Sequence, residues 1–172
     1  PMHRLLCMAG GYTSLWGFMS YEGGVFAECA TYGTAMANST RDDLLNSRLI
    51  IMWGWDPAVT IQRCNTPYYL SRAKEAGARI VAVDPRYTDS AATFADEWIP
   101  IYPCTDAAML IAMAYVMITE NLCDQAFLNK YTLGFEKFRD YVLGIEDGTP
   151  KTPAWAEVIT GAKATTIARL AR

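Results

Sequence analysis

Two continuous apolar runs dominate the middle of the chain, at residues 48–53 and 79–83. Neither run alternates apolar and polar positions, and such runs are typical of parallel strands that are buried on both faces. A weaker run at residues 97–101 predicts a third strand. We therefore expect a short parallel sheet in which the first two strands are both central and covered by helices on each face.

Helical patterns connect these strands and follow them. Residues 67–76 predict a helix that ends at Gly77, so that strand, helix and strand form one right-handed βαβ unit. The second connection, residues 87–96, is short and polar and predicts only an irregular turn of helix. The strongest helical pattern covers residues 107–121. Other short helices are predicted at residues 39–46, 124–131, 135–142, 153–159 and 164–172.

This order of elements predicts a three-layer α/β domain with a short parallel sheet of Rossmann or flavodoxin type and helices on both faces. The 172 residues are enough for one such domain, so we assign residues 1–172 to a single domain. The sequence starts within an apolar pattern, without Met, and stops within a helical pattern. We expect it to be an internal part of a longer parent protein, whose targeting signal would lie elsewhere.

Composition excludes several classes of protein. The chain is 52% hydrophobic and 19% charged, which is ordinary for a globular domain, and its net charge of -3 gives no basic surface for nucleic acid. Its longest apolar stretch, residues 107–118, is too short to span a bilayer. The five cysteines form no C-x-x-C pair, so they indicate neither a zinc site nor a disulfide framework, and we expect most to be buried thiols.

Each predicted strand runs into a turn that carries a carboxylate, at Asp56, Asp84 and Asp106. Ligands of open parallel sheets bind outside the carboxyl ends of the strands, so three carboxylates there favour a shared binding role. A purely structural role also explains each carboxylate separately. Asp56, which precedes Pro57, and Asp106 are suited to cap helices, and Asp84 is suited to a turn. A ligand edge also predicts free amides at the start of the helix that follows Asp106.

Two common nucleotide-binding motifs are missing from the sequence, and their absence narrows the class of ligand. A dinucleotide site needs G-x-G-x-x-G after its first strand, and a P-loop needs G-K-[ST], but here Gly54 is followed by Trp55. Simple NAD or ATP binding is therefore disfavoured. His3 is the only histidine and is a poor candidate for a general base, which disfavours a self-contained hydrolase.

Five stretches in order resemble the molybdopterin oxidoreductases related to dimethyl sulfoxide reductase. They are residues 5–20 with W-G-F-M-S, 49–57 ending in G-W-D-P, 77–88 with D-P-R-Y-T, 96–108 with D-E-W-I-P-I and T-D-A-A, and 127–132 with F-L-N-K-Y-T. Each motif alone is weak, but their order and spacing together are specific and cover nearly the whole chain. Cys104 departs from the Gly or Gln that the family usually has at that loop position.

The resemblance implies a bis(molybdopterin guanine dinucleotide) molybdenum cofactor and an oxygen-atom transfer reaction, with Ser20 as the catalytic residue and ligand to the metal. It also implies cofactor-binding residues in three turns. These are Gly54, Asp56 and Pro57 near a pterin or pyrophosphate, and Asp84, Pro85, Arg86, Thr105 and Asp106 in the turns that hold a guanosine end.

A serine at the metal position favours enzymes that reduce an S- or N-oxide, because relatives acting on nitrate or formate generally carry Cys or selenocysteine there. The resemblance further implies an iron-sulfur cluster and an electron-transfer subunit of the parent protein, which would be exported or membrane-associated. The isolated segment should lack activity. Two alternatives remain open: a stand-alone nucleotide-binding module of flavodoxin type, and a structural segment that supports a site built elsewhere.

Overall fold

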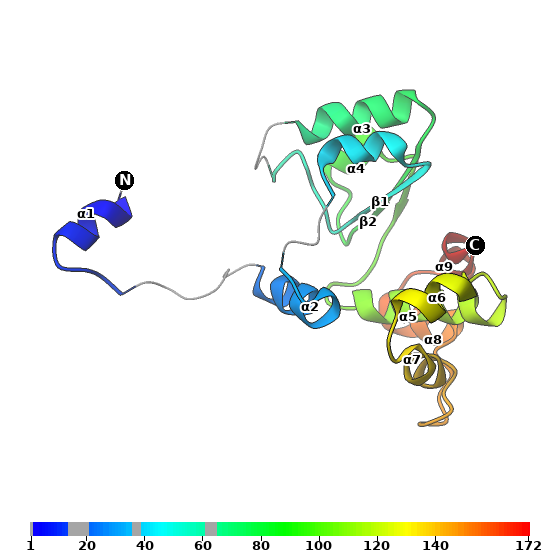
Figure 1. The fold of residues 1–172 in the computed structure, drawn as a ribbon. Coiled ribbons are helices and arrows are strands. Elements are labelled where there is room, and N and C mark those ends of the chain that lie inside the picture. Colours follow the sequence, from blue (N-terminus) through cyan, green and yellow to red (C-terminus); the bar gives the residue numbers. More distant parts are fainter. Residues whose placement is uncertain (1, 14–20, 36–38, 61–64) are drawn as a thin grey trace. The chain divides into compact units, whose positions relative to one another are not determined.

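The computed structural model describes residues 2–13, 21–35, 39–60 and 65–172 (Figure 1). The chain divides into two compact units, Pro1–Thr40 and Arg41–Arg172. The first unit contains helix α1 (Met2–Met8) and helix α2 (Glu22–Tyr32), and α2 ends at Gly33 in the left-handed conformation. Whether residues 1–172 act as one domain stays a prediction.

The second unit contains a parallel sheet of β1 (Leu49–Trp53), β2 (Arg79–Val83) and β3 (Glu97–Ile99). The strands lie in the order β1-β2-β3, with Ile50 opposite Ile80 and Val83 opposite Ile99. The three predicted strands and their parallel direction are confirmed. The sheet therefore brings all three carboxyl ends to the same edge.

The prediction that the first two strands are both central is wrong for β1. Within the described part of the chain β1 pairs only with β2, and Leu49 at its start is 46% exposed. The apolar run was informative about the two faces of the strand, since Ile50 and Met52 are buried and Ile51 and Trp53 are half-buried. Side-chain pattern says nothing about the neighbour in the plane of the sheet, which the backbone contacts.

Helices cover both faces of the sheet, as expected. Ile80 and Ala82 of β2 pack with Leu70 of α3 (Thr66–Glu75) and Phe94 of α4 (Asp89–Phe94). The opposite face packs against α5 (Asp106–Thr119), α8 (Pro153–Thr160) and α9 (Ala164–Ala171). Its buried residues are Val81, Val83, Ile99, Ile101, Met109, Ala112, Ala156, Ala162 and Ile167. The three-layer α/β arrangement is therefore present around this sheet.

Two connections differ from their predictions. The second connection contains a regular helix, α4, rather than an irregular turn, because the Thr88 hydroxyl caps it by accepting the Ala91 amide at 3.1 Å. No helix starts at Asp56, where the Val59 and Thr60 amides instead donate to the Asp56 carbonyl in a turn. The predicted helix before β1 is a 3₁₀ helix, η1 (Arg41–Asn46).

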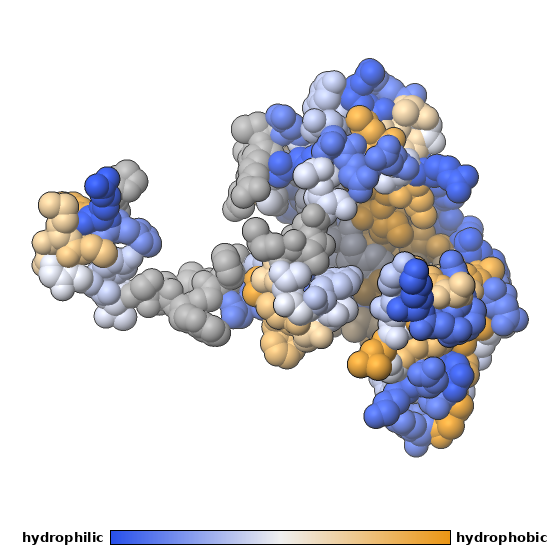
Figure 2. Space-filling model, in the orientation of Figure 1, coloured by the Kyte–Doolittle hydropathy of each residue, from blue (hydrophilic) through white to orange (hydrophobic). Residues whose placement is uncertain are grey.

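Helices α6 (Gln125–Tyr131) and α7 (Phe135–Val142) follow the pattern of the sequence. No residue of α6 is buried, and its stability is local: the Asp124 carboxylate accepts the Phe127 amide at 2.9 Å, and Phe127 packs on Tyr131 one turn away. Orange apolar patches interrupt the hydrophilic surface around these helices (Figure 2). The large exposed apolar residues there include Leu122, Phe127, Tyr131, Leu133 and Phe138.

The expectation of buried cysteines is wrong for the four that the structure describes. Cys7, Cys29 and Cys104 are exposed and Cys123 is half-buried, while Cys64 lies outside the described residues. Cys104 adopts a left-handed φ of 64°, a conformation that favours glycine. None of the helices in the described ranges has the length and apolar character that crossing a membrane requires.

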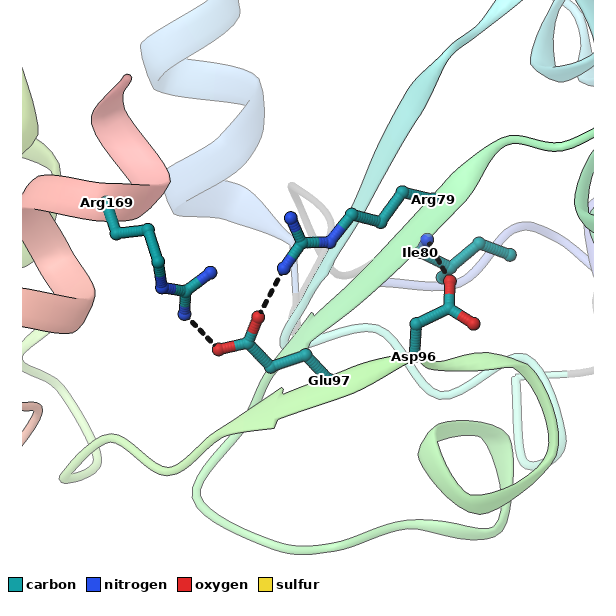
Figure 3. Close-up of polar contacts among 5 residues, drawn as sticks. All are labelled: Arg79, Ile80, Asp96, Glu97 and Arg169. Carbon is teal, nitrogen blue, oxygen red and sulfur yellow. Dashed lines mark hydrogen bonds and ion pairs between the residues drawn. The ribbon is translucent and has the colours of Figure 1, made fainter.

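Ion pairs close the start of the sheet, opposite its carboxyl edge (Figure 3). Glu97 of β3 pairs with Arg79 of β2 at 2.7 Å and with Arg169 of α9. The Asp96 carboxylate accepts the Ile80 amide at 2.8 Å. Hydrogen bonds from Arg169, and then from Arg79, lower the pKa of Glu97, and the Ile80 amide lowers the pKa of Asp96. Glu97 therefore links two strands to a helix of the covering layer.

We expect Glu97→Gln to lower the free energy of unfolding by about 0.5–1 kcal/mol near neutral pH, since its partners are half exposed. The pKa of Glu97 is lower in the folded state than in the unfolded state. Its contribution to the free energy of unfolding is therefore complete above the unfolded-state pKa and is lost as pH falls through the folded-state pKa. Urea unfolding of the chain between pH 3 and 7 should show the difference shrinking below about pH 4. Glu75→Gln, in the exposed pair with Arg72, is the control; a pH-independent difference for Glu97→Gln would contradict the prediction.

Candidate functional site

The turn after β1 is set by Gly54. Its amide donates to the Val83 carbonyl at 2.9 Å, and its φ of 55° lies in the left-handed region that favours glycine. The chain therefore leaves β1 directly beside the end of β2, and Pro57 is buried in the turn that follows. This places Asp56 next to the turn that follows β2.

Asp56 and Arg86, predicted from separate turns, meet at this edge. The Asp56 Oδ2 atom lies 3.5 Å from Arg86 Nη2, and Asp56 Oδ1 accepts the Ser90 hydroxyl at 2.5 Å. The Asp56 side chain is 14% exposed and that of Arg86 is 74% exposed. The carboxylate therefore lies inside the turn, while the guanidinium extends to the surface.

Asp84 organises the D-P-R turn. Its Oδ1 atom accepts the Arg86 amide at 2.8 Å, the local bond of an Asx turn. Its own amide donates to the Ile99 carbonyl at 3.2 Å, and its carbonyl accepts the indole N–H of Trp98 at 2.9 Å. Pro85 is exposed between these bonds. The turn is thus attached to β3, and the half-buried Asp84 side chain is held in a defined orientation.

Asp106 is the first residue of α5, and its Oδ1 atom accepts the indole N–H of Trp53 at 2.8 Å. The Thr105 hydroxyl donates to the Tyr102 carbonyl at 2.6 Å and does not cap the helix. The expectation of free amides is wrong for Ala108, whose N–H donates to the Thr105 carbonyl at 3.1 Å in a tightened first turn. The candidate ligand groups of this turn therefore do not include the Ala108 amide.

Three partners of the predicted residues were not identified from sequence: Ser90, Trp53 and Trp98. Each bonds a residue that lies distant in sequence, so no local pattern reports it. The only available signal was the need of a half-buried indole N–H for an acceptor. Ser20 lies outside the described residues. In the part of the chain that the structure describes, no group of three His, Cys, Asp or Glu residues is arranged to hold a metal.

Among the described residues, two surface hollows lie near helices α5, α6 and α7, and neither is at the carboxyl edge. One, of about 330 Å³, is lined by residues from the end of α5 to α7, and another, of about 240 Å³, by residues of α6 and α7. Both include Phe135 and Glu136, and neither is lined by a predicted site residue. The candidate site at the carboxyl edge therefore rests on its side chains and not on either of these hollows.

A family model of molybdopterin oxidoreductases matches residues 13–169, so the chain belongs to the molybdopterin oxidoreductase family. The dimethyl sulfoxide reductase DmsA of Escherichia coli (strain K12) is 42% identical over 98% of this chain and 23% of its own length. The dimethyl sulfoxide/trimethylamine N-oxide reductase of Rhodobacter capsulatus is 33% identical over 99% of this chain and 22% of its own length. The chain thus spans less than a quarter of these relatives.

A solved structure has a similar fold. Acetylene hydratase from Pelobacter acetylenicus superposes with a TM-score of 0.61 at 27% sequence identity, over 73% of this chain and 16% of that protein. Most of this chain therefore shares its fold with that solved structure.

Proposed function

We propose that this chain is the part of a molybdenum enzyme that holds a molybdopterin guanine dinucleotide at the carboxyl edge of its sheet, and that the intact enzyme reduces an S- or N-oxide. The observation that carries the proposal is the state of Asp84 and Asp106. Each uses one carboxylate oxygen in an internal bond, and among the described residues the second oxygen of each accepts no hydrogen bond. Two oriented acceptors therefore remain at one edge.

The donors and acceptors of the edge match the chemistry of such a cofactor. Guanine N1–H and N2–H₂ and ribose hydroxyls are donors, and carboxylates bind donors by charge-assisted bonds. The exposed Arg86 guanidinium suits a phosphate oxygen, and the small Gly54 allows close approach of backbone to a ligand. Because the edge side chains are already held by internal bonds, little ordering would be needed on binding.

Other residues of the three turns have supporting parts in this proposal. Pro57 and Pro85 restrict the two turns, and Thr105, whose proton is directed to Tyr102, offers its oxygen as an acceptor. We also propose that residues 1–172 are one α/β domain of Rossmann or flavodoxin type in the intact enzyme. Support comes from the β1-α3-β2-α4-β3 order and from the packing of α5 on the opposite face.

The cofactor, when bound, supplies the two-electron oxygen-atom chemistry, and the protein orients it. Ser20 would provide an alkoxide oxygen to the molybdenum, a hard donor suited to a high-valent metal. The relatives that support an S- or N-oxide substrate are named dimethyl sulfoxide and trimethylamine N-oxide reductases. Since reduction consumes two electrons, we propose that the intact enzyme receives them through an iron-sulfur cluster and an electron-transfer subunit outside this chain.

The direct test is to purify the intact enzyme and measure its molybdenum, its acid-released guanine and its reduction of dimethyl sulfoxide and trimethylamine N-oxide by a reduced dye. We expect a pair of guanines for each molybdenum and turnover of at least one oxide. Guanine without molybdenum would contradict the proposal and favour a nucleotide-binding module. Molybdenum without turnover of either oxide would refute the substrate class.

A further inference from the structure

We infer that Ser90 is a positioning residue, which holds Asp56 so that Arg86 is presented to an anionic group of the cofactor, such as its pyrophosphate. The inference rests on the proposed function and extends it to a residue that the family motifs did not identify. Asp56 then acts through Arg86 rather than by touching the cofactor itself.

The Ser90 hydroxyl ties the turn after β1 to helix α4. Ser90 is fully buried, donates to Asp56 Oδ1 at 2.5 Å and accepts the Ala58 amide at 2.9 Å. One hydroxyl thus satisfies two groups of the same turn with both its donor and an acceptor lone pair. Bonds in such a chain polarise and strengthen one another in a buried setting. We call Ser90, Asp56 and Ala58 the clasp.

The clasp also determines what Asp56 can do. One carboxylate oxygen is used by Ser90 and the other faces Arg86 at 3.5 Å. A carboxylate that is nearly buried and already bonded offers little to a ligand, and its charge would repel a phosphate. Its opposite charge instead attracts the Arg86 guanidinium, which keeps further N–H donors at the surface for a planar anion.

Arg86 is fixed from its backbone as well. Its amide donates to Asp84, and two residues later Thr88 caps helix α4, which carries Ser90. The segment from Asp84 to Ser90 is therefore anchored at both ends, and the Asp56 carboxylate adds a contact to the side chain between them. Without the Ser90 hydroxyl, the Asp56 carboxylate would lose its short hydrogen bond. The turn after β1 would also lose its connection to helix α4.

Hydrogen exchange in the 172-residue chain tests the clasp without any cofactor. Ser90→Ala should speed exchange of the Ala58 amide by about tenfold or more, while the Ile80 amide in β2 stays protected. Thr152→Ala is the matched control, because the Thr152 hydroxyl also accepts a helix amide, from Trp155, but caps α8. Unchanged exchange at Ala58 in Ser90→Ala would overturn the inference.

A double-mutant cycle in the intact holoenzyme tests the positioning role of Ser90. The measured quantity is the rate at which the protein loses its guanine-containing cofactor during dialysis. Arg86→Ala and Ser90→Ala should each speed release by about tenfold, and the double variant should release no faster than Arg86→Ala alone. Thr152→Ala should not change release in either background. Additive effects of Ser90→Ala and Arg86→Ala, or normal release in Ser90→Ala, would overturn this inference and leave the proposed function intact. A normal rate of cofactor release in Arg86→Ala would mean that Arg86 does not contact a phosphate. This result would overturn the inference and take that contact out of the proposed function.

Discussion

The intact enzyme with Ser20→Ala is expected to keep its cofactor and lose more than a hundredfold of its oxide reduction, since even outer partners of metal ligands cost about 10–100-fold. Retention is expected because, in the proposed function, the carboxyl edge and not Ser20 contacts the guanosine end. The measurement is molybdenum content and turnover of the same preparation. Ser39→Ala, at an exposed serine of the described part, is the control.

Ser20→Cys separates a metal ligand from a residue that only shapes the loop. A thiolate is a softer donor than an alkoxide, so a ligand exchange should change the absorption spectrum of the bound molybdenum while the site stays filled. Full turnover in Ser20→Ala, or an unchanged spectrum in Ser20→Cys, would mean that the metal ligand lies elsewhere. The preference for S- and N-oxides would then lose its support.

Asp106→Ala should reduce the cofactor content of the intact enzyme, because a charge-assisted bond to guanine contributes about 1.5–3 kcal/mol, or roughly ten- to a hundredfold in affinity. Asp106→Asn keeps an acceptor for the Trp53 indole but loses the charge. We therefore expect reduced molybdenum and guanine in both variants, with Asn the milder. Asp124→Asn, at the cap of α6, controls for a carboxylate at a helix start. Normal content in Asp106→Asn would make Asp106 a structural partner of Trp53.

The elements of the fold could be predicted because local patterns determine them. The apolar runs that became β1 and β2 predicted parallel strands, and Asp124 and Pro153 mark helix starts that the structure confirms. The edge position of β1 could not be predicted, because it depends on a backbone neighbour in the plane of the sheet. The helix α4 had a local signal, the capping Thr88, which its short polar sequence obscured.

For the candidate site too, some residues could be predicted from the sequence and their tertiary contacts could not. Strand ends and turn residues identified Asp56, Asp84 and Asp106, and the parallel sheet places their turns at one edge. Their partners, Ser90 and Trp53, come from other segments, so only the folded chain reveals that Asp56 is internally bonded while Asp84 and Asp106 keep an oxygen free of bonds within the described residues. Tertiary contacts thus distinguish a positioning carboxylate from two candidate ligands, which the sequence presents as equivalent.

The central claim is that the cofactor lies at the carboxyl edge of the sheet, and hydrogen exchange of the intact enzyme with and without its cofactor tests it most directly. We predict added protection at residues 54–58, 84–88 and 104–108, which form the three turns. The opposite end of the sheet, with Glu97 and Arg169, should exchange equally in both forms. Equal exchange at all three turns, with protection elsewhere in the chain, would contradict a cofactor site at this edge.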